Sequence, residues 1–394
     1  MNDLLILNAC AVLPDAVTDK VSVLVLNGRI AEINCQSAVP KDTPTLDADG
    51  GYLFAGFIDS HVHGGGGADF MDATVEAFET TAAAHLKHGT TMLVPTSMTA
   101  SPAELEGFVK AYLDFVKSKH KGAKTLGLHL EGPYLSGAGE KSKGAQRSDL
   151  LRYPDIEEVK RLLKLAEGHI VRWDIAPELP GALNLAAYLS EKGVICSVAH
   201  SAATADEAEA GFKAGFSHVT HCYNAVNTYH KVGQKVLDGT VEAAYLNDSV
   251  VIEFICDGCH IPKGVVKLAL KIKGADRVCA VTDAMRIAGT DMKKAYLGTK
   301  TGGCEVIVDD GVAKLPDMSS FAGSIATADR CLRVLCRDYG VDLVDASKML
   351  SLSPARLHGI DTDYGSIEVG KIADLVLTDS DYNVKTVILD GNIV

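Results

Sequence analysis

The chain has 394 residues, with 38 Lys and Arg against 51 Asp and Glu, and a formal net charge of −13. With 47% hydrophobic and 23% charged residues, its composition is that of a soluble globular protein and excludes wholesale disorder. The acidic balance argues against nucleic acids and anionic membranes as partners, because both are bound by basic surfaces.

Both ends of the chain are predicted to be β-structure. Short apolar or alternating runs, separated by turn signals, occur at Leu4–Val12, Val21–Leu26, Ile30–Ile33, Ala373–Leu377 and Val384–Leu389. Neither end alone has enough strands for an independent sheet. We therefore expect residues 1–51 and 360–394 to form one small β-sandwich domain together, with the termini side by side.

The region between them, residues 52–359, alternates short β-rich segments with helical patterns. Strands are expected at Leu53–His63, Thr90–Thr96, Thr125–Glu131, Val171–Glu178, Val194–His200, His218–Asn224, Val250–Asp257 and Arg277–Asp283. Helices are expected at Ala73–Lys87, Pro102–Lys117, Ile156–Ala166, Thr204–Ala214 and Pro262–Lys273, with Ser101 and Thr204 at N-cap positions. This α/β alternation favours a closed, TIM-like (β/α)₈ barrel, with a doubly wound open sheet as the alternative.

Polar side chains gather at the C-terminal ends of these strands, the end that carries the active site in barrel enzymes. They are His61, His63, His129, Glu131, His200, His221, Asp257, His260 and Asp283. His61 and His63 stand two residues apart on a strand, so both side chains point to one face and can hold one metal ion. Four glycines, Gly64–Gly67, follow them and allow the backbone to approach a ligand closely.

Five of these residues form a candidate metal site: His61, His63, Glu131, His200 and His221. One histidine at a strand end is more often a hydrogen-bonded core residue than a ligand, but four with a glutamate at matching ends favour ligation. Nitrogen and carboxylate ligands without thiolate suit Zn²⁺, Fe²⁺, Mn²⁺ or Co²⁺. Five ligands exceed the needs of one tetrahedral ion, so we expect one or two divalent ions, with Glu131 as the bridge.

Asp283 is the candidate general acid and base. A carboxylate beside a metal-held water can accept its proton and deliver it to the leaving group. The alternative for Asp283 is a structural acid that orients a histidine, which is the role expected of Asp59. His85 and His88, three residues apart on a predicted helix, are expected to be solvated surface residues rather than a metal clip.

The ten cysteines are scattered through a chain too long to need disulfides, and we expect reduced thiols. The string Cys256-Asp257-Gly258-Cys259-His260 matches the haem-attachment pattern, but chance cysteines around an Asp and a His are favoured over a haem or a redox dithiol. The start of the chain lacks the features of a signal peptide, and no apolar run approaches the ~20 residues of a membrane span. We therefore expect a cytoplasmic protein.

The motifs resemble a known family. Phe57–Gly64 is similar to the first-strand signature of the amidohydrolase superfamily, and Gly365–Val376 resembles its C-terminal return into the β domain. Further motifs, in the same order along nearly the whole chain, resemble the N-acetylglucosamine-6-phosphate deacetylase family of that superfamily. They are Gly127–Tyr134, Ala199–Ser201, Thr220–Ala225, Asp257–His260, Thr282–Met285 and Ala322–Ser324.

The resemblance implies a metal-dependent enzyme that removes the N-acetyl group of an amino-sugar phosphate and releases acetate. It implies metal ligation by Glu131, His200 and His221, and a second ion at the His61 and His63 pair, which some members replace. It places Asp283 on the catalytic aspartate of the family. Asn224, the backbone of Ala225, and His260 fall on sugar-phosphate contacts. The family is typically a homodimer in which a basic residue reaches the neighbouring site.

Two motifs depart from the family pattern. Where the family has Lys-Gly-x-His, this chain has Lys143-Gly144-Ala145-Gln146, so Gln146 would donate its amide N–H to the acyl carbonyl in place of histidine. The loop that carries the phosphate-binding arginine of the family is Tyr229–Gly233 here, with His230 or Lys231 as the substitute. A lysine cannot make the bidentate fork of an arginine. Both departures leave another N-acetyl hexosamine, with or without phosphate, open as the substrate.

Two other functions are open alternatives. One is an amidohydrolase of N-acyl amino acids or cyclic amides; many cyclic-amide enzymes use a carbamylated lysine between two metals, and Val171–Glu178 contains no lysine. The other is a scaffold without enzymatic activity. A scaffold of that kind is expected to have lost metal ligands, and a purified protein without stoichiometric metal would support it.

Overall fold

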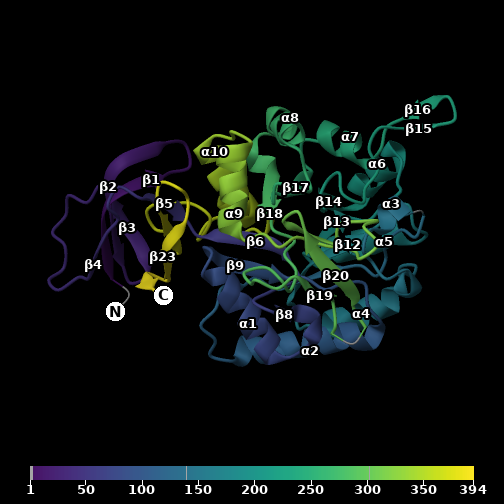
Figure 1. Ribbon diagram of the computed structural model, residues 1–394, viewed down its shortest axis with the longest axis horizontal. Helices are drawn as coiled ribbons and strands as arrows, with labels where there is room; N and C mark the ends of the chain where they lie inside the picture. The colour runs from purple at the N-terminus through teal and green to yellow at the C-terminus, as the bar shows by residue number, and fades with distance from the viewer. Residues whose placement is uncertain (1–2, 139, 301) are drawn as a thin grey trace.

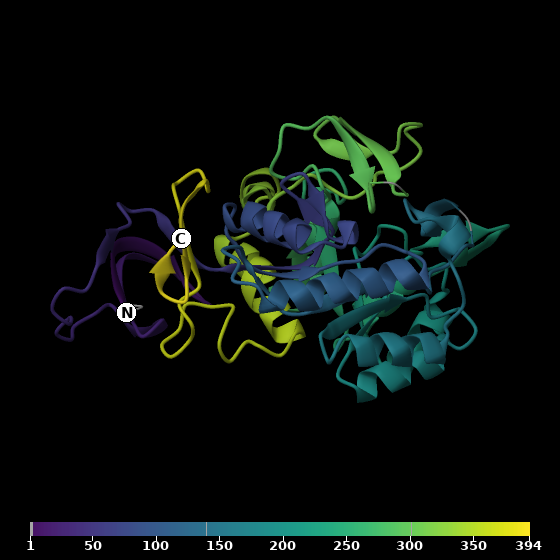
Figure 2. The ribbon, with the colours of Figure 1, turned by 90° about the horizontal axis from the view of Figure 1, so that it is seen from below.

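The computed structural model describes residues 3–138, 140–300 and 302–394. Strands from the two ends of the chain, purple and yellow in Figures 1 and 2, lie side by side at one end of the molecule. The remainder is a body of parallel strands with helices around it. Among the described residues, no helix combines the length and the apolar character that crossing a bilayer requires.

The terminal strands form one sheet of eight. Its members are β1 (Leu4–Val12), β2 (Val17–Leu26), β3 (Arg29–Ile33), β4 (Thr45–Asp47), β5 (Tyr52–Ala55), β22 (Leu375–Thr378), β23 (Val384–Leu389) and β24 (Asn392–Ile393). The order is β24-β23-β22-β5-β1-β2-β3, with β4 paired to β1. Strand β5 joins the two ends of the chain, because it pairs with β1 on one side and β22 on the other. Apolar side chains of this sheet, such as Ile6, Val23 and Ile388, form a core of their own.

The single strand predicted at Leu53–His63 is wrong, since the structure divides it at Gly56 into β5 and β6. A side chain at Gly56 is excluded, because a Cβ there would lie 2.1 Å from Thr91 Oγ1. The chain therefore passes from the terminal sheet into the body at a point where the Thr91 side chain packs directly on its backbone. The terminal sheet reaches Ala55, beyond the boundary predicted at residue 51. The division into two domains, and a sandwich rather than a sheet, stay predictions.

Parallel strands form the ring that positions the site. They are β6 (Phe57–Val62), β9 (Thr90–Pro95), β10 (Lys124–Thr125), β11 (Leu128–Glu131), β12 (Ile170–Ile175), β13 (Ile195–Val198), β14 (Phe216–Val219), β17 (Val251–Ile255) and β18 (Val278–Val281). They make two sheets, β10-β9-β6 and β11-β12-β13-β14-β17-β18. Parallel bridges between Thr96 and His129 and between Val62 and Ala284 join the sheets at both seams. The expected α/β barrel-like arrangement is thus confirmed over the open sheet.

Helices surround this ring. They are α1 (Val75–Leu86), α2 (Pro102–Lys117), α3 (Glu140–Lys143), α4 (Ile156–Leu165), α5 (Ala182–Glu191), α6 (Ala205–Ala214), α7 (Thr240–Leu246), α8 (Lys263–Lys273), α9 (Ala328–Arg333), α10 (Leu343–Ser347) and α11 (Ser353–Leu357). Ser101 and Thr204 cap α2 and α6, as predicted, each in a reciprocal capping box with the glutamate three residues later. Shorter helical turns lie at Phe70–Asp72, Ser148–Leu150, Ala275–Arg277, Val334–Asp338 and Lys348–Leu352.

Small antiparallel elements lie outside the ring. They are β7 (Gly64–Gly65) with β8 (Ala68–Asp69), β15 (His230–Val232) with β16 (Lys235–Leu237), and β19 (Lys294–Leu297) with β20 (Cys304–Asp309) and β21 (Val312–Lys314). The β15–β16 hairpin projects from the body in Figure 1. The β19–β21 sheet follows the last ring strand, β18, and the segment after β21 contributes to the wall of the cavity described below.

Candidate metal centre and active site

Three of the candidate residues are each the second residue after a ring strand and share an unusual backbone conformation. His200 follows β13, His221 follows β14 and Asp283 follows β18, with φ angles of 44°, 27° and 48°. Residues other than glycine rarely enter this left-handed region, and those that do gather at functional sites. The same conformation therefore occurs where three strands end at the mouth of the ring.

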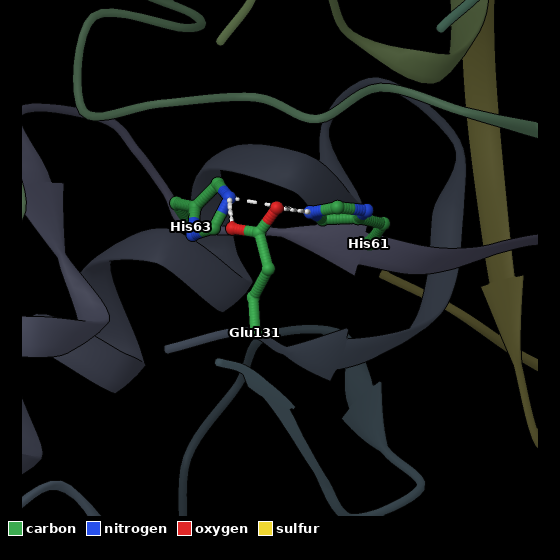
Figure 3. Close-up of side chains that lie close together, drawn as sticks. All are labelled: His61, His63 and Glu131. Atoms are coloured by element: carbon green, nitrogen blue, oxygen red, sulfur yellow. Dashed lines mark hydrogen bonds and ion pairs between the residues drawn. The ribbon is translucent and has the colours of Figure 1, made fainter. Parts of the chain in front are cut away.

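Glu131, the last residue of β11, lies at the centre of the cluster. Its Oε1 is 3.0 Å from His200 Nε2 and 3.1 Å from His221 Nε2. Its Oε2 is 3.4 Å from His63 Nε2, and its Oε1 is 3.9 Å from His61 Nε2. Figure 3 shows His61, on β6, and His63, just after it, turned toward Glu131. All five side chains are buried, so the predicted ligands are together.

The hydrogen bonds on the far side of each ring indicate where the protons are. Nδ1 of His61 faces a Glu253 carboxylate oxygen at 2.8 Å, which can only accept a hydrogen bond. Nδ1 of His200 and of His221 face the backbone carbonyls of Ser142 and Asn224, each at 2.9 Å. A bound cation would therefore find each of these rings with its proton on Nδ1 and with the Nε2 lone pair on the side of the Glu131 carboxylate. Lone pairs that face a carboxylate fit a bound cation.

The donors divide into two groups that share Glu131. One is His61, His63 and Glu131, and the other is Glu131, His200 and His221; within each, the donor atoms lie within 4.8 Å of one another. Asp283 Oδ1 lies beside the first group, at 3.1 Å from His63 Nε2 and 3.5 Å from His61 Nε2. The set of imidazoles and carboxylates fits one or two divalent ions of the Zn²⁺ type.

Electrostatics favour the charged form of these carboxylates. Burial alone would raise the pKa of Glu131, but the hydrogen bonds from His200 and His221 hold it well below its usual value. Burial also opposes the ionisation of Asp283, yet the neighbouring His61 and His63 lower its pKa. Burial lowers the pKa of His63, but Asp283 and Glu131 outweigh it and raise the value to about 9. The centre thus concentrates negative charge where a cation would be held.

Gln146 lies beside the Glu131 carboxylate. Its Nε2 donates to Glu131 Oε2 at 2.9 Å, while its Oε1 accepts from the Thr99 backbone N–H at 3.0 Å. Two hydrogen bonds therefore fix the amide and show which end is the nitrogen. In this arrangement Gln146 orients Glu131, whereas the sequence motif predicts that its amide donates to an acyl carbonyl.

A cavity of about 420 Å³ opens next to the cluster. Its walls include His63, Glu131, Gln146, His200, His221 and Asp283, together with Lys143, Asn224, Ala225, His260 and Phe321. Asn224 Nδ2 is buried without a hydrogen-bond partner among the described residues, so it is a free donor for a ligand. His260 Nδ1 is held by Asp257 Oδ2 at 2.9 Å, and the His260 ring packs against Phe321 with their centroids 4.8 Å apart.

His230 and Lys231 lie apart from this wall. Both belong to the projecting β15–β16 hairpin, where His230 Nδ1 contacts the Thr228 carbonyl at 2.9 Å, and neither lines the cavity. Their predicted role toward a phosphate stays a prediction. Lys143, the first residue of the Lys-Gly-Ala-Gln motif, lines the cavity instead.

The other sequence patterns have structural explanations. Cys256 and Cys259 are free thiols, and Asp257 between them accepts the backbone N–H groups of Cys259 and His260. The prediction of a solvated His85 is wrong: its ring is buried and donates from Nε2 to the Gly64 carbonyl at 3.0 Å. Gly65 makes room for it, because a Cβ there would lie 2.8 Å from that nitrogen.

One buried carboxylate was missed altogether. Glu253, in the middle of β17, bonds His61 Nδ1 and forms an ion pair with the fully buried Arg172 of β12. Its only sequence signal is a single charge within the apolar run Val251–Ile255. Asp59 Oδ2 accepts a hydrogen bond from the Thr282 hydroxyl at 2.5 Å, so Asp59 fixes the segment that begins directly after β18.

The sequence profile of the amidohydrolase family matches residues 52–394, the part of the chain that contains the whole cluster. The chain belongs to the amidohydrolase family. This amidohydrolase is 32% identical over 390 residues to the N-acetylglucosamine-6-phosphate deacetylase of Lysinibacillus sphaericus, covering 99% of this chain and 97% of that protein. It is 30% identical to the N-acetylgalactosamine-6-phosphate deacetylase of Escherichia coli O157:H7, with 93% of each chain covered.

Among solved structures, the amidohydrolase is similar to the crystal structure of N-acetylglucosamine-6-phosphate deacetylase from Pasteurella multocida. The TM-score is 0.90 at 32% sequence identity, and the match covers 100% of this chain and 99% of that one. The resemblance inferred from the sequence motifs is thereby confirmed.

Proposed function

We propose that this protein is a metal-dependent deacetylase that hydrolyses N-acetylglucosamine 6-phosphate to glucosamine 6-phosphate and acetate. The observation that carries the proposal is the shared carboxylate, Glu131, between two pairs of histidines at the mouth of the ring. The full-length similarity to deacetylases of amino-sugar phosphates supports the substrate class. The free donor of Asn224 in the cavity wall supports a polar ligand.

The metal site is assigned to His61, His63, Glu131, His200 and His221, with one or two ions of Zn²⁺, Fe²⁺, Mn²⁺ or Co²⁺. When bound, such ions supply Lewis-acid activation of water and of the acyl carbonyl. Glu131 holds both groups of histidines at one place, and Gln146 holds Glu131 through Oε2. The residues of the chain thus fix the distance between the two halves of the site.

Asp283 moves the proton in this mechanism. Its carboxylate lies within 3.1 Å of His63 and lines the cavity, and its lowered pKa keeps it ionised and able to accept a proton from the attacking water. It then delivers that proton to the amide nitrogen as the bond to the acetyl carbon breaks. Asn224, the Ala225 backbone and His260 hold the sugar, while His230 and Lys231 are assigned to the phosphate.

The experiment that tests the function is a substrate panel run with measured metal content. We expect acetate release from N-acetylglucosamine 6-phosphate in preference to the unphosphorylated sugar. Preference for N-acetylgalactosamine 6-phosphate is the second candidate, which the Escherichia coli relative favours. Release from an N-acyl amino acid alone, or a protein that binds no metal, would refute the deacetylase proposal.

We propose further that the protein is a cytoplasmic homodimer. The projecting β15–β16 hairpin supports a second copy as its partner, because Tyr229, Val232 and Val236 are exposed apolar side chains beside Lys231 and Lys235. Free cysteines throughout the described chain are consistent with a reducing compartment. Light scattering of the purified protein tests the dimer, and Val232→Lys with Val236→Lys is expected to yield monomers.

A further inference from the structure

The Glu253 side chain, in the middle of strand β17, accepts hydrogen bonds from three different residues. It is fully buried. Oε2 accepts from Arg172 Nη1 at 2.7 Å, and Oε1 accepts from Arg172 Nη2 at 3.0 Å. Oε1 also accepts from His61 Nδ1 at 2.8 Å and from the His221 backbone N–H at 3.1 Å. One carboxylate therefore contacts a residue of each half of the proposed metal site.

The four candidate histidines differ in what holds their outer nitrogen. Nδ1 of His200 and of His221 each meet a backbone carbonyl. Nδ1 of His63 has no hydrogen-bond partner among the described residues. Only His61, of these four, has a carboxylate at Nδ1. In the pair His61 and His63, only the His61 ring is therefore held at Nδ1 by a hydrogen bond among the described residues, and Glu253 provides it.

We propose that Glu253, locked by Arg172, is a positioning residue that determines whether the ion at His61 and His63 is bound. The inference rests on the proposed function, since it concerns the metal site assigned there. A carboxylate can only accept, so it keeps the His61 proton on Nδ1 and leaves the Nε2 lone pair directed at Glu131. The ion at His200 and His221 does not need Glu253 for its rings, because backbone carbonyls hold both.

Arg172 makes this orientation rigid. Its guanidinium is completely buried and engages both oxygens of Glu253, and its Nε contacts Asp174 Oδ1 at 3.2 Å. The carboxylate cannot rotate away from His61 without breaking the bidentate pair. A glutamine in its place has one acceptor oxygen and one amide nitrogen. That nitrogen would face either Arg172 or His61, and in both cases a donor would face a donor.

The test is the metal content of Glu253→Gln after equilibrium dialysis against Mn²⁺ at a series of free concentrations. We expect the affinity of the His61 and His63 ion to fall about 10- to 100-fold, the range for loss of such an outer partner. The ion at His200 and His221 is expected to stay, which also reports that the chain is folded. In the electron paramagnetic resonance spectrum, the coupled signal of two adjacent Mn²⁺ ions should give way to that of one.

Glu158→Gln is the matched control. Glu158 is also a buried glutamate in a bidentate pair, with Arg152 Nη2 at 2.6 Å and Nε at 3.0 Å, but it contacts no metal-site histidine. We expect this variant to bind two ions with parental affinity. Loss of an ion in both variants would show a general effect of breaking a buried ion pair, and would overturn the assignment.

Two further variants keep the proposal falsifiable if Glu253→Gln does not fold. Arg172→Met with Glu253→Leu removes both buried charges together, which buried ion pairs tolerate better than loss of one partner; it should bind one ion. In a His61→Asn background, Glu253→Gln should cause no additional loss of metal, since Glu253 acts through His61.

The outcomes separate this inference from the proposed function. A parent protein that binds two ions, with Glu253→Gln also binding two at parental affinity, overturns the inference and leaves the function intact. A parent that binds a single ion overturns it as well. A parent that binds no metal overturns the proposed function itself, and with it the assignment of Glu253.

Discussion

Asp283 Oδ1 lies 3.1 Å from His63 Nε2, so the proposed proton carrier touches the proposed metal site. Changing Asp283 to Asn keeps the shape of the side chain but removes its ability to accept a proton. We expect kcat to fall about 10²- to 10⁴-fold, the usual contribution of general acid–base catalysis, with metal content unchanged. Steady-state kinetics together with metal analysis checks this, and a kcat within tenfold of the parent would refute the role.

Glu131 is the only described residue that belongs to both candidate metal groups. Glu131→Gln should therefore weaken both ions, because an amide is a poorer ligand than a carboxylate. His61→Asn should weaken only the first ion, and His200→Asn only the second. Metal titration of the three variants measures this pattern. If Glu131→Gln retains one ion at parental affinity, Glu131 is not shared.

The order of strands and helices could be predicted because hydrophobic periodicity and caps are local signals. Ser101 and Thr204 predicted the starts of α2 and α6, and the polar residues at the ends of the strands indicated the site. The break at Gly56 left no signal other than a glycine in an apolar run, because its cause is the side chain of Thr91 from another strand. Glu253 was missed for the same reason, since its partner His61 lies 192 residues earlier.

Gln146 occupies the position at which the family motif predicts a donor to the acyl carbonyl, but its Nε2 donates to Glu131. Removing it in Gln146→Ala frees the Glu131 Oε2 and the Thr99 N–H. We expect activity to fall about 10- to 100-fold, as for other residues that orient a metal ligand. Gln146→Glu should be worse, because a second carboxylate would face Glu131. Parental kcat in Gln146→Ala would contradict the orienting role.

His85 predicts a pH dependence of stability. Burial lowers the pKa of His85 from 6.5 to about 4, and the hydrogen bond to the Gly64 carbonyl only partly opposes this shift. Below pH 6.5 the histidine is protonated in the unfolded chain but stays neutral in the folded chain. Its contribution to the free energy of unfolding is therefore fully present above pH 6.5 and is lost as the pH falls toward 4. The decline from this residue reaches about 3 kcal/mol.

His85→Gln keeps an N–H donor near Gly64 and cannot titrate in this range. Its free energy of unfolding should therefore fall less steeply between pH 6.5 and pH 4 than that of the parent. Urea unfolding of the metal-free proteins at several pH values measures the difference and avoids competition between protons and metal. Parallel curves for parent and variant would show that His85 does not contribute.

The position of β5 between β1 and β22 has a consequence for biosynthesis. The ribosome delivers β1 to β5 first and β22 to β24 last, so the edge of β5 that later receives β22 stays unpaired while the whole ring is being translated. An unpaired apolar edge is a template for association with other nascent chains. Premature termination before Leu375 would therefore release a polypeptide in which the apolar edge of β5 stays unpaired, so we expect it to bind chaperones or to aggregate.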